Sequence, residues 1–168
     1  MAIPVYLWLY EEEGKLLKGG VNVNGREGSI ELVGMQHDVF IPTDDMTGSA
    51  TGTRQHEAYT FEKEIDPSSP LLYRALTTGR TLAKAIFRYY RINNNGMEEE
   101  YFNAVLENVK VCHVVPIMFD IKDPDFEKQG HIEHVGLRYE KFTWNYVDGN
   151  IQHADSWKER KTASGDHS

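Results

Sequence analysis

The chain has 168 residues, the length of one domain, and it is 40% hydrophobic and 11% aromatic, which is enough for a core and excludes wholesale disorder. Its formal net charge is −8 at pH 7, and its Lys and Arg residues gather nowhere beyond the short run at 158–161. This argues against a nucleic-acid partner, because phosphate binding needs basic side chains gathered on one face. The single cysteine, Cys112, excludes an intrachain disulfide, and in its apolar segment we expect it to be buried and inert.

The N-terminus predicts neither a cleaved signal nor a membrane anchor. Residues 1–10 are apolar, but they are too few for a signal peptide, carry no positive region and run directly into three glutamates at 11–13. No other stretch approaches the length of a membrane span. We therefore expect a protein made soluble in the cytoplasm, with no membrane insertion, which leaves the cell, if it does, without a cleaved signal.

The first half of the chain predicts strands separated by turns. We expect strands over 2–10, 21–23, 29–41 and 53–65, the last with Tyr59 and Phe61 on one side. Between the last two, residues 42–52 are small and polar without periodicity. A loop of this length in a compact domain is typically functional, so we expect it to contact another molecule.

One short helix follows these strands. Ser69 suits its N-cap, Pro70 its first turn and Gly79 its C-terminal end. Leu72, Ala75 and Leu76 share one apolar face at helical spacing. A helix this short must pack on the sheet to be stable.

The most prominent pattern is a long hairpin between residues 81 and 118. Its two strands are joined by Asn93–Gly96, where Asn-Gly predicts a type I′ turn with positive φ at both central residues. Both faces of the first strand mix apolar and polar side chains, so both faces should contact protein, as in a barrel wall or a subunit interface.

A charged loop and a second hairpin complete the chain. The acidic and histidine residues of the loop match no compact metal motif; they are Asp123, Asp125, Glu127, His131 and His134. Residues 135–146 alternate strictly as one strand, Asp148 and Gly149 form a tight turn, and 151–157 return. The whole predicts a mostly β fold, an antiparallel barrel or two-sheet sandwich with one short α-helix at its side. We expect a single domain at 1–160 and a flexible tail at 161–168.

The sequence carries no catalytic pattern. The serine of Gly48–Gly52 is misplaced for a nucleophile elbow, and the segment lacks the Lys-Ser/Thr ending of a phosphate loop. No Cys/His or Ser/His/Asp set falls on recognisable turns. We therefore expect no enzyme, no cofactor and no metal.

Eight ordered segments between residues 2 and 163 carry a family resemblance. They are Arg26–Glu31, Phe40–Asp44, Thr51–Arg54, Lys63–Pro70, Leu106–Val111, Leu137–Trp144, Asp148–Ile151 and Ala154–Trp157. In their order and spacing the chain resembles the haemolysin-coregulated protein (Hcp) family, the tube subunit of the bacterial type VI secretion system.

The resemblance implies a non-catalytic barrel that assembles into hexameric rings. It also implies that the rings stack into a hollow tube inside a sheath, and that the tube is propelled with a spike into a target cell. The implied partners are other copies of the chain, the sheath, spike and baseplate proteins, and small effectors in the lumen. The protein would stay in the cytoplasm before firing and be secreted afterwards.

The resemblance also points to assembly residues. The loop at 43–53 matches the family's extended loop, which contacts the adjacent ring. We expect the stacking surface to include Thr43, Asp44, Thr47, Gly48 and Thr53. Gln36, in the strand before it, is a candidate for facing the lumen. Two alternatives stay open: a monomeric small-molecule-binding barrel of lipocalin type, and an Hcp-like adaptor that mainly carries effectors.

Overall fold

A computed structural model describes residues 3–126, 128 and 130–157, and the predicted tail at 161–168 lies outside them. In this part of the chain the fold is mostly β, as predicted, with a single nine-residue α-helix. The strands are β1 (Val5–Glu11), β2 (Ile30–Leu32), β3 (Gly34–Gln36), β4 (Val39–Phe40), β5 (Gln55–His56), β6 (Tyr59–Glu64), β7 (Thr81–Ile92), β8 (Glu98–Ile117), β9 (Ile132–Arg138), β10 (Lys141–Tyr146) and β11 (Ile151–Ser156). The helices are α1 (Ser69–Thr77) and the short 3-10 turn η1 (Pro124–Phe126).

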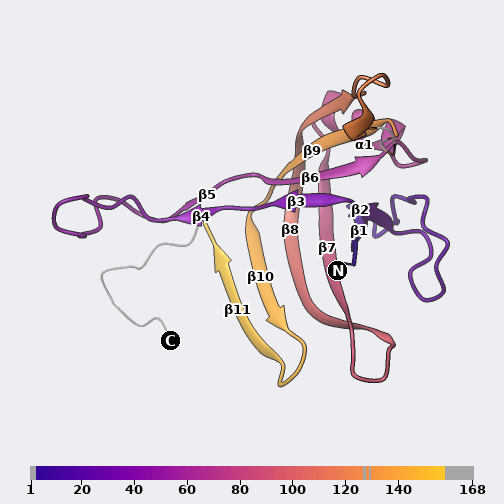
Figure 1. Ribbon diagram of the computed structural model, residues 1–168. Helices are drawn as coiled ribbons and strands as arrows, with labels where there is room; N and C mark the ends of the chain where they lie inside the picture. The colour runs from indigo at the N-terminus through magenta and orange to yellow at the C-terminus, as the bar shows by residue number, and fades with distance from the viewer. Residues whose placement is uncertain (1–2, 127, 129, 158–168) are drawn as a thin grey trace.

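Nine of the strands form one antiparallel sheet that curls around the core (Figure 1). The order is β2-β1-β7-β8-β9-β6-β3, and β10 and β11 extend the sheet from the other half of β8. The edge strands β2 and β3 are consecutive pieces of chain separated by Val33, whose amide donates to the Glu62 carbonyl at 2.9 Å. The path therefore begins and ends in the same segment, and the sheet bends into a sandwich-like shell.

The core fills the inside of this shell. Tyr59 and Phe61 share the buried face of β6, as the alternation predicted, and Tyr59 stacks on Phe87 with ring centroids 4.0 Å apart. The other large apolar side chains that are fully buried come from the strands around them and from α1: Leu7, Leu9, Ile30, Leu72, Leu82, Leu106, Leu137 and Phe142. Burying each of these contributes about 1.5–3 kcal/mol.

The long hairpin is confirmed as β7 and β8, but its turn is not of type I′. Gly96 has φ +75°, whereas Asn95 keeps a negative φ. The Gly96 amide donates to the Asn93 carbonyl, and the Asn93 amide to the Met97 carbonyl, at 3.0 and 2.8 Å. This is a three-residue loop in which only the glycine is left-handed.

Both faces of β7 carry buried residues because the register shifts along it. In the pairing with β1, Tyr10 lies opposite Lys84 and Glu11 opposite Leu82, so Ala83 is an extra residue and forms a step in the ladder. On the other side, Asn108 of β8 lies between the partners of Leu82 and Lys84 and takes a left-handed φ of +53°. The step exchanges the faces, so Leu82 and Ala85 are both buried although they differ in parity.

Four of the predicted strands are wrong in existence or extent. Residues 21–23 form no strand; that loop folds back because the Arg26 guanidinium lies 4.8 and 4.0 Å from the Tyr6 and Tyr90 ring centroids and pairs with Glu98 at 2.6 Å. The spans 29–41 and 53–65 are interrupted where the chain leaves the sheet. The span 135–146 breaks between β9 and β10, which pair with different halves of β8.

The predicted helix is confirmed with its cap moved by one residue. Ser68 takes the N-cap position, and the chain leaves the helix through Gly79 at φ +65°. Ser69 instead turns its hydroxyl inward, where it donates to Glu133 at 3.0 Å. Leu72 and Ala75 are buried and Leu76 is partly buried, so the predicted apolar face packs on the core.

The prediction for Cys112 is wrong, because its side chain is exposed. The pairing of β8 with β9 shifts between Val111 and His113, so Cys112 has no partner in the ladder and faces solvent. Among the described residues, no three His, Cys, Asp or Glu side chains converge in a way that could hold a metal ion. Within the same residues, none of the helices has both the length and the apolar character needed to cross a membrane.

Candidate assembly surface

The feature that stands out from the body of the protein is a long projecting segment, residues 37–58, which we call the arm (Figure 1). Its outer part, residues 42–52, was predicted as a loop between two strands, but the whole arm is a hairpin. Its strands β4 and β5 pair through Val39 with His56 and Phe40 with Gln55. Further out, the Thr51 amide donates to the Pro42 carbonyl and the Asp44 amide to the Ser49 carbonyl, both at 2.8 Å. Backbone bonds therefore hold the arm together along most of its length.

The predicted loop residues build the tip of the arm rather than a separate site. The Asp44 carboxylate accepts the Met46 and Thr47 amides at 2.7 and 3.1 Å, which lowers the pKa of Asp44. The Gly48 amide donates to the Asp44 carbonyl at 2.8 Å, and Gly48 has φ +71°. Thr43 pairs with Ala50 at the start of this turn. The tip thus brings together four of the five predicted residues, all of them exposed.

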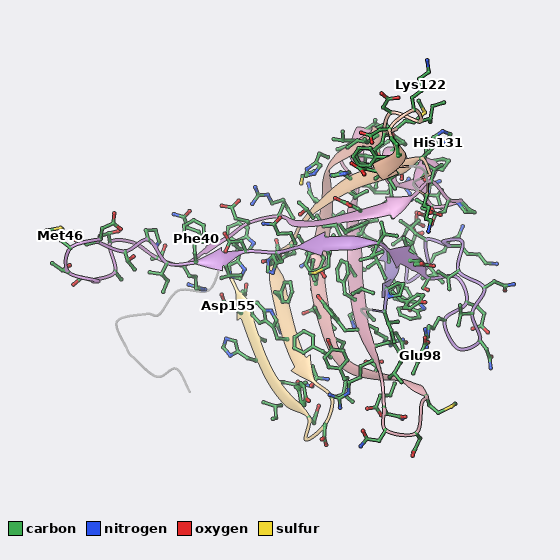
Figure 2. All side chains as sticks on the ribbon, viewed as in Figure 1. Phe40, Met46, Glu98, Lys122, His131 and Asp155 are labelled. Carbon is green, nitrogen blue, oxygen red and sulfur yellow. The ribbon has the colours of Figure 1, made fainter. Side chains whose placement is uncertain are left out.

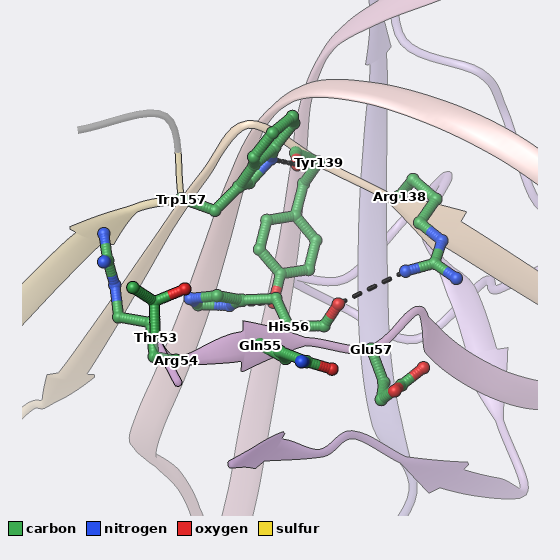
Figure 3. Close-up of a pocket in the computed structure, with 8 residues that line it drawn as sticks. All are labelled: Thr53, Arg54, Gln55, His56, Glu57, Arg138, Tyr139 and Trp157. Carbon is green, nitrogen blue, oxygen red and sulfur yellow. Dashed lines mark hydrogen bonds between the residues drawn. The ribbon is translucent and has the colours of Figure 1, made fainter. Parts of the chain in front are cut away.

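The fifth residue, Thr53, lies at the root of the arm and lines a hollow of about 1060 Å³ (Figure 3). Gln36 lies on β3, just before the arm, with an exposed side chain and a carbonyl that accepts the Thr60 hydroxyl at 3.1 Å. Neither residue reaches the tip.

Sequence reasoning missed the apolar side chains that the arm exposes. Val39 and Phe40 are each 38% exposed and Ile41 is 51% exposed, while Met46 at the tip is 93% exposed (Figure 2). Three consecutive apolar residues cannot all face one core from a strand, because successive side chains point to opposite faces. That run at 39–41 was the available signal. Apolar side chains held out in water on a hydrogen-bonded hairpin are typical of a protein–protein contact.

A network of polar side chains fastens the root of the arm to the body. His37 and His56, one from each side of the arm, both bond the Tyr139 hydroxyl at 2.6 Å, through Nε2 and Nδ1 respectively. The other nitrogen of His56 bonds the Asp155 carboxylate at 2.7 Å, and the same oxygen accepts Arg54 Nε at 2.6 Å. We call these five residues the root network.

The environment of the root network shifts the pKa of several groups. Burial, together with the nearby His56, lowers the pKa of His37 to about 4. The hydrogen bond from Arg54 leads the causes that lower the pKa of Asp155, and burial raises the pKa of Tyr139. At neutral pH, therefore, Asp155 is charged and His37 is neutral.

Two contacts surround the network (Figure 3). Arg138 donates to the His56 carbonyl at 3.2 Å, and the Trp157 indole donates to the Tyr139 carbonyl. The arm is thus attached to β9, to the segment after it and to the end of β11.

The outer face of the sheet is a second candidate surface. Where β1, β7, β8, β10 and β11 lie side by side, one cross-strand row is largely apolar: Trp8, Ile86, Val105, Thr143 and Ala154. These side chains alternate along their strands with Phe87, Leu106 and Phe142, which face the core, so the row lies on the opposite face of the sheet. A broad face of this kind suits a wall that meets a neighbouring subunit or lines a channel.

The comparisons with known proteins agree with one another. A family model described as "Type VI secretion system effector, Hcp" matches residues 6–146. The "Major exported protein" of Pseudomonas aeruginosa is 30% identical over 167 residues, covering 94% of this chain and 97% of that protein.

Solved structures extend this agreement to the fold. A mutant form of the Hcp1 protein from E. coli EAEC 042 is 55% identical, with a TM-score of 0.84, and the match covers 93% of this chain and 99% of that one. The secreted protein Hcp3 from Pseudomonas aeruginosa is 25% identical, with a TM-score of 0.76, and the same shares of the two chains are covered.

Proposed function

We propose an assembly for this chain, which belongs to the Hcp family and is a tube subunit of the type VI secretion system. In this proposal, copies of the chain close into hexameric rings, and the arm joins one ring to the next. A ring of identical subunits needs a head-to-tail interface that closes by rotation. The family is a structural part of the secretion system, and this chain is proposed to act without catalysis.

The observation that carries this proposal is the construction of the arm. A free loop would lose conformational entropy on docking, which weakens binding. Here the hairpin bonds fix the conformation beforehand, and the root network fixes the direction in which Phe40, Ile41 and Met46 are presented. A preformed projection with exposed apolar side chains supports a role in joining subunits.

The remaining roles follow from the same premise. We propose that the tube works with sheath, spike and baseplate proteins and carries small effectors in its lumen, where Gln36 stays a candidate lining residue. A relative is named for its export, and we propose that this chain likewise moves from the cytoplasm to the outside without a cleaved signal. The lipocalin-type alternative has less support, since the fully buried aromatic rings of Tyr59, Phe61, Phe87 and Phe142 occupy the interior where a ligand cavity would lie.

Deleting residues 45 to 51 tests the proposal. The deletion removes the tip and leaves the root network and the sheet intact, so single rings should form while tubes should not. Size exclusion with light scattering would give a species of about 116 kDa, six copies of 19.3 kDa, and negative-stain images would show isolated rings.

Two results would contradict the proposal. Tubes of normal length from the deletion variant would remove the arm from the stacking contact. A full-length chain that stays a 19.3 kDa monomer over a wide concentration range would remove the ring itself and favour the ligand-binding barrel.

A further inference from the structure

When both imidazoles are neutral, the root network has one arrangement of protons. Asp155 is a carboxylate and can only accept, so the proton on its bond with His56 belongs to His56 Nε2. The Nδ1 of a neutral His56 must then accept a hydrogen bond, and the Tyr139 hydroxyl donates it. The Tyr139 oxygen in turn accepts from His37 Nε2. Each of the three bonds then has one donor and one acceptor.

Acid removes this arrangement. When both imidazoles are protonated, Tyr139 faces an N–H donor on each side, and its own hydroxyl proton has no acceptor in the network. Two cations then lie with ring centroids 6.5 Å apart, in a site where His37 is packed against Phe142 at a centroid distance of 4.6 Å. A partly satisfied polar network in such a place is worse than none, because burial strengthens both the repulsion and the cost of the unmet donor.

The surrounding charges favour a charged His56, through Asp155, but they do not compensate for the charge on His37. Asp155 already accepts from both Arg54 and His56, and it lies on the far side of His56 from His37. Asp38 is the acidic group that favours a charged His37, and it is outweighed by burial and by His56. The titratable and charged groups around the two rings are Asp38, Arg54 and Glu57 on the arm, Tyr59 on β6, Arg138 on β9, Tyr139 after it, and Asp155 on β11, with His153 stacked behind Trp144.

We propose that the root network is an acid-sensitive latch, which fixes the direction of the arm while both histidines are neutral and lets the arm swing when both are protonated. The latch joins the two sides of the arm to a single hydroxyl, so its loss loosens both strands of the hairpin. The bonds from Arg54 to the Asp155 carboxylate and to the Ser156 carbonyl need no neutral histidine, so they keep the arm tethered while it changes direction. The internal bonds of the arm contain no histidine ring, so the hairpin survives and moves as a unit. The effect on ring stacking rests on the proposed function, whereas the latch itself belongs to one chain.

The test is a distance measurement within one chain. Spin labels go on Cys112, which is exposed on β8, and on Ser49→Cys at the tip, and labelled chains are diluted in unlabelled protein. Double electron–electron resonance should give a narrow distribution of the distance between the two labels at pH 7.5 and a distribution at least twice as wide at pH 4.0. Circular dichroism at both pH values checks that the sheet is retained.

Three variants separate the latch from general acid damage. His37→Phe keeps an aromatic ring on Phe142 and removes the titrating group, so its distance should stay narrow at both pH values. Tyr139→Phe removes the shared hydroxyl, so its distribution should already be wide at pH 7.5. His131→Phe, an exposed histidine far from the arm, should broaden at pH 4.0 like the parent (Figure 2).

The latch is overturned if the parent stays narrow at pH 4.0, if His37→Phe broadens as much as the parent, or if Tyr139→Phe is narrow at pH 7.5. Because the labels report on a single chain, the result does not depend on ring stacking. Tubes are imaged separately, so a released arm in a protein that never forms tubes would support the latch and count against the stacking role.

Discussion

Lys63 is the residue that most clearly joins separate elements in the interior. Its side chain has no exposed surface, and its ammonium lies 2.8 Å from the Glu133 carboxylate and 2.9 Å from that of Asp66. It also donates to the Ser69 hydroxyl and the Glu64 carbonyl, both at 3.0 Å. One buried charge therefore links β6, β9 and the start of α1. It is tolerated because every hydrogen of the Lys63 ammonium has an acceptor.

Lys63→Met should lower the free energy of unfolding by about 3–5 kcal/mol, because Glu133, only 1% exposed, would keep a buried charge without its cation. The double variant Lys63→Met with Glu133→Met should regain most of that loss, since it removes both charges. Urea unfolding would measure both. Lys84→Met, at an exposed position on β7, is the matched control and should change stability by about 0.5 kcal/mol or less. An equal loss in the single and double variants would contradict the pairing.

His37 makes stability depend on pH at the scale of one residue. Its pKa falls from 6.5 in the ordinary state to about 4 in the folded chain, because burial disfavours the charged ring. Between these values the unfolded chain binds more protons than the folded one, so its free energy of unfolding should decrease as pH falls from about 6.5 to 4. The low pKa of Asp155 adds a further loss at lower pH, when that carboxylate becomes protonated.

His37→Phe should flatten this part of the curve, which chemical denaturation at several pH values would measure. His131→Phe should leave the slope as it is. If the slope between pH 6.5 and 4 is the same in His37→Phe as in the parent, His37 is not its source.

At the scale of elements, register shifts decide where the sheet bends. They occur in the pairing of β1 with β7, of β7 with β8, and of β8 with β9. Each breaks the alternation of faces and increases the local twist. The shift in β8 places His113 opposite Gly136 on β9, with its ring over the glycine.

Gly136→Ala should therefore strain the pairing of β8 with β9 at His113. A Cβ at this position would lie 2.1 Å from the His113 ring, closer than any real contact. We expect the free energy of unfolding to fall by about 1–3 kcal/mol, as in overpacked cores. Adding His113→Ala should recover part of the loss by opening the space.

Gly130→Ala is the matched control, because its nearest atom is 3.9 Å away, and it should cost much less. Thermal or urea unfolding measures all three variants. If Gly136→Ala is as stable as Gly130→Ala, the ring does not block the position.

At the scale of the whole molecule, the arm and the curled sheet have separate tasks. The shell buries the large inward-facing residues of β6, β7 and β8 without any contribution from the tip of the arm. The arm extends well beyond it, with Met46 at its end (Figure 2). A change at the tip can thus alter assembly without altering the fold.

Met46→Asp should shorten or abolish tubes while leaving rings and thermal stability unchanged. Met46 bonds only through its amide, so the turn is kept, and a charge replaces the apolar side chain that is proposed to dock. Met118→Asp is the control, at another exposed methionine outside the arm, and should still give tubes. Negative-stain measurement of tube lengths compares the two, and equal lengths would contradict a docking role for the tip.

The sequence by itself determined the features that depend on neighbours in the chain. The sequence predicted the positions of the Asn93–Gly96 and Asp148–Gly149 turns, though not the type of the first, as well as the α1 boundaries to within one residue and the buried pair Tyr59 and Phe61. These follow from turn residues, caps and alternation, which act over a few positions. The eight ordered segments likewise carried the family.

Only the tertiary structure decided the register shifts, the exposure of Cys112 and the root network. A bulge depends on the partner strand, which is invisible in a local pattern. His37 and Tyr139 are 102 residues apart, and His56 and Asp155 are 99 apart, so nothing in their spacing linked them. They meet because the curled sheet carries the end of β11 and the turn after β9 to the point where the arm leaves the body.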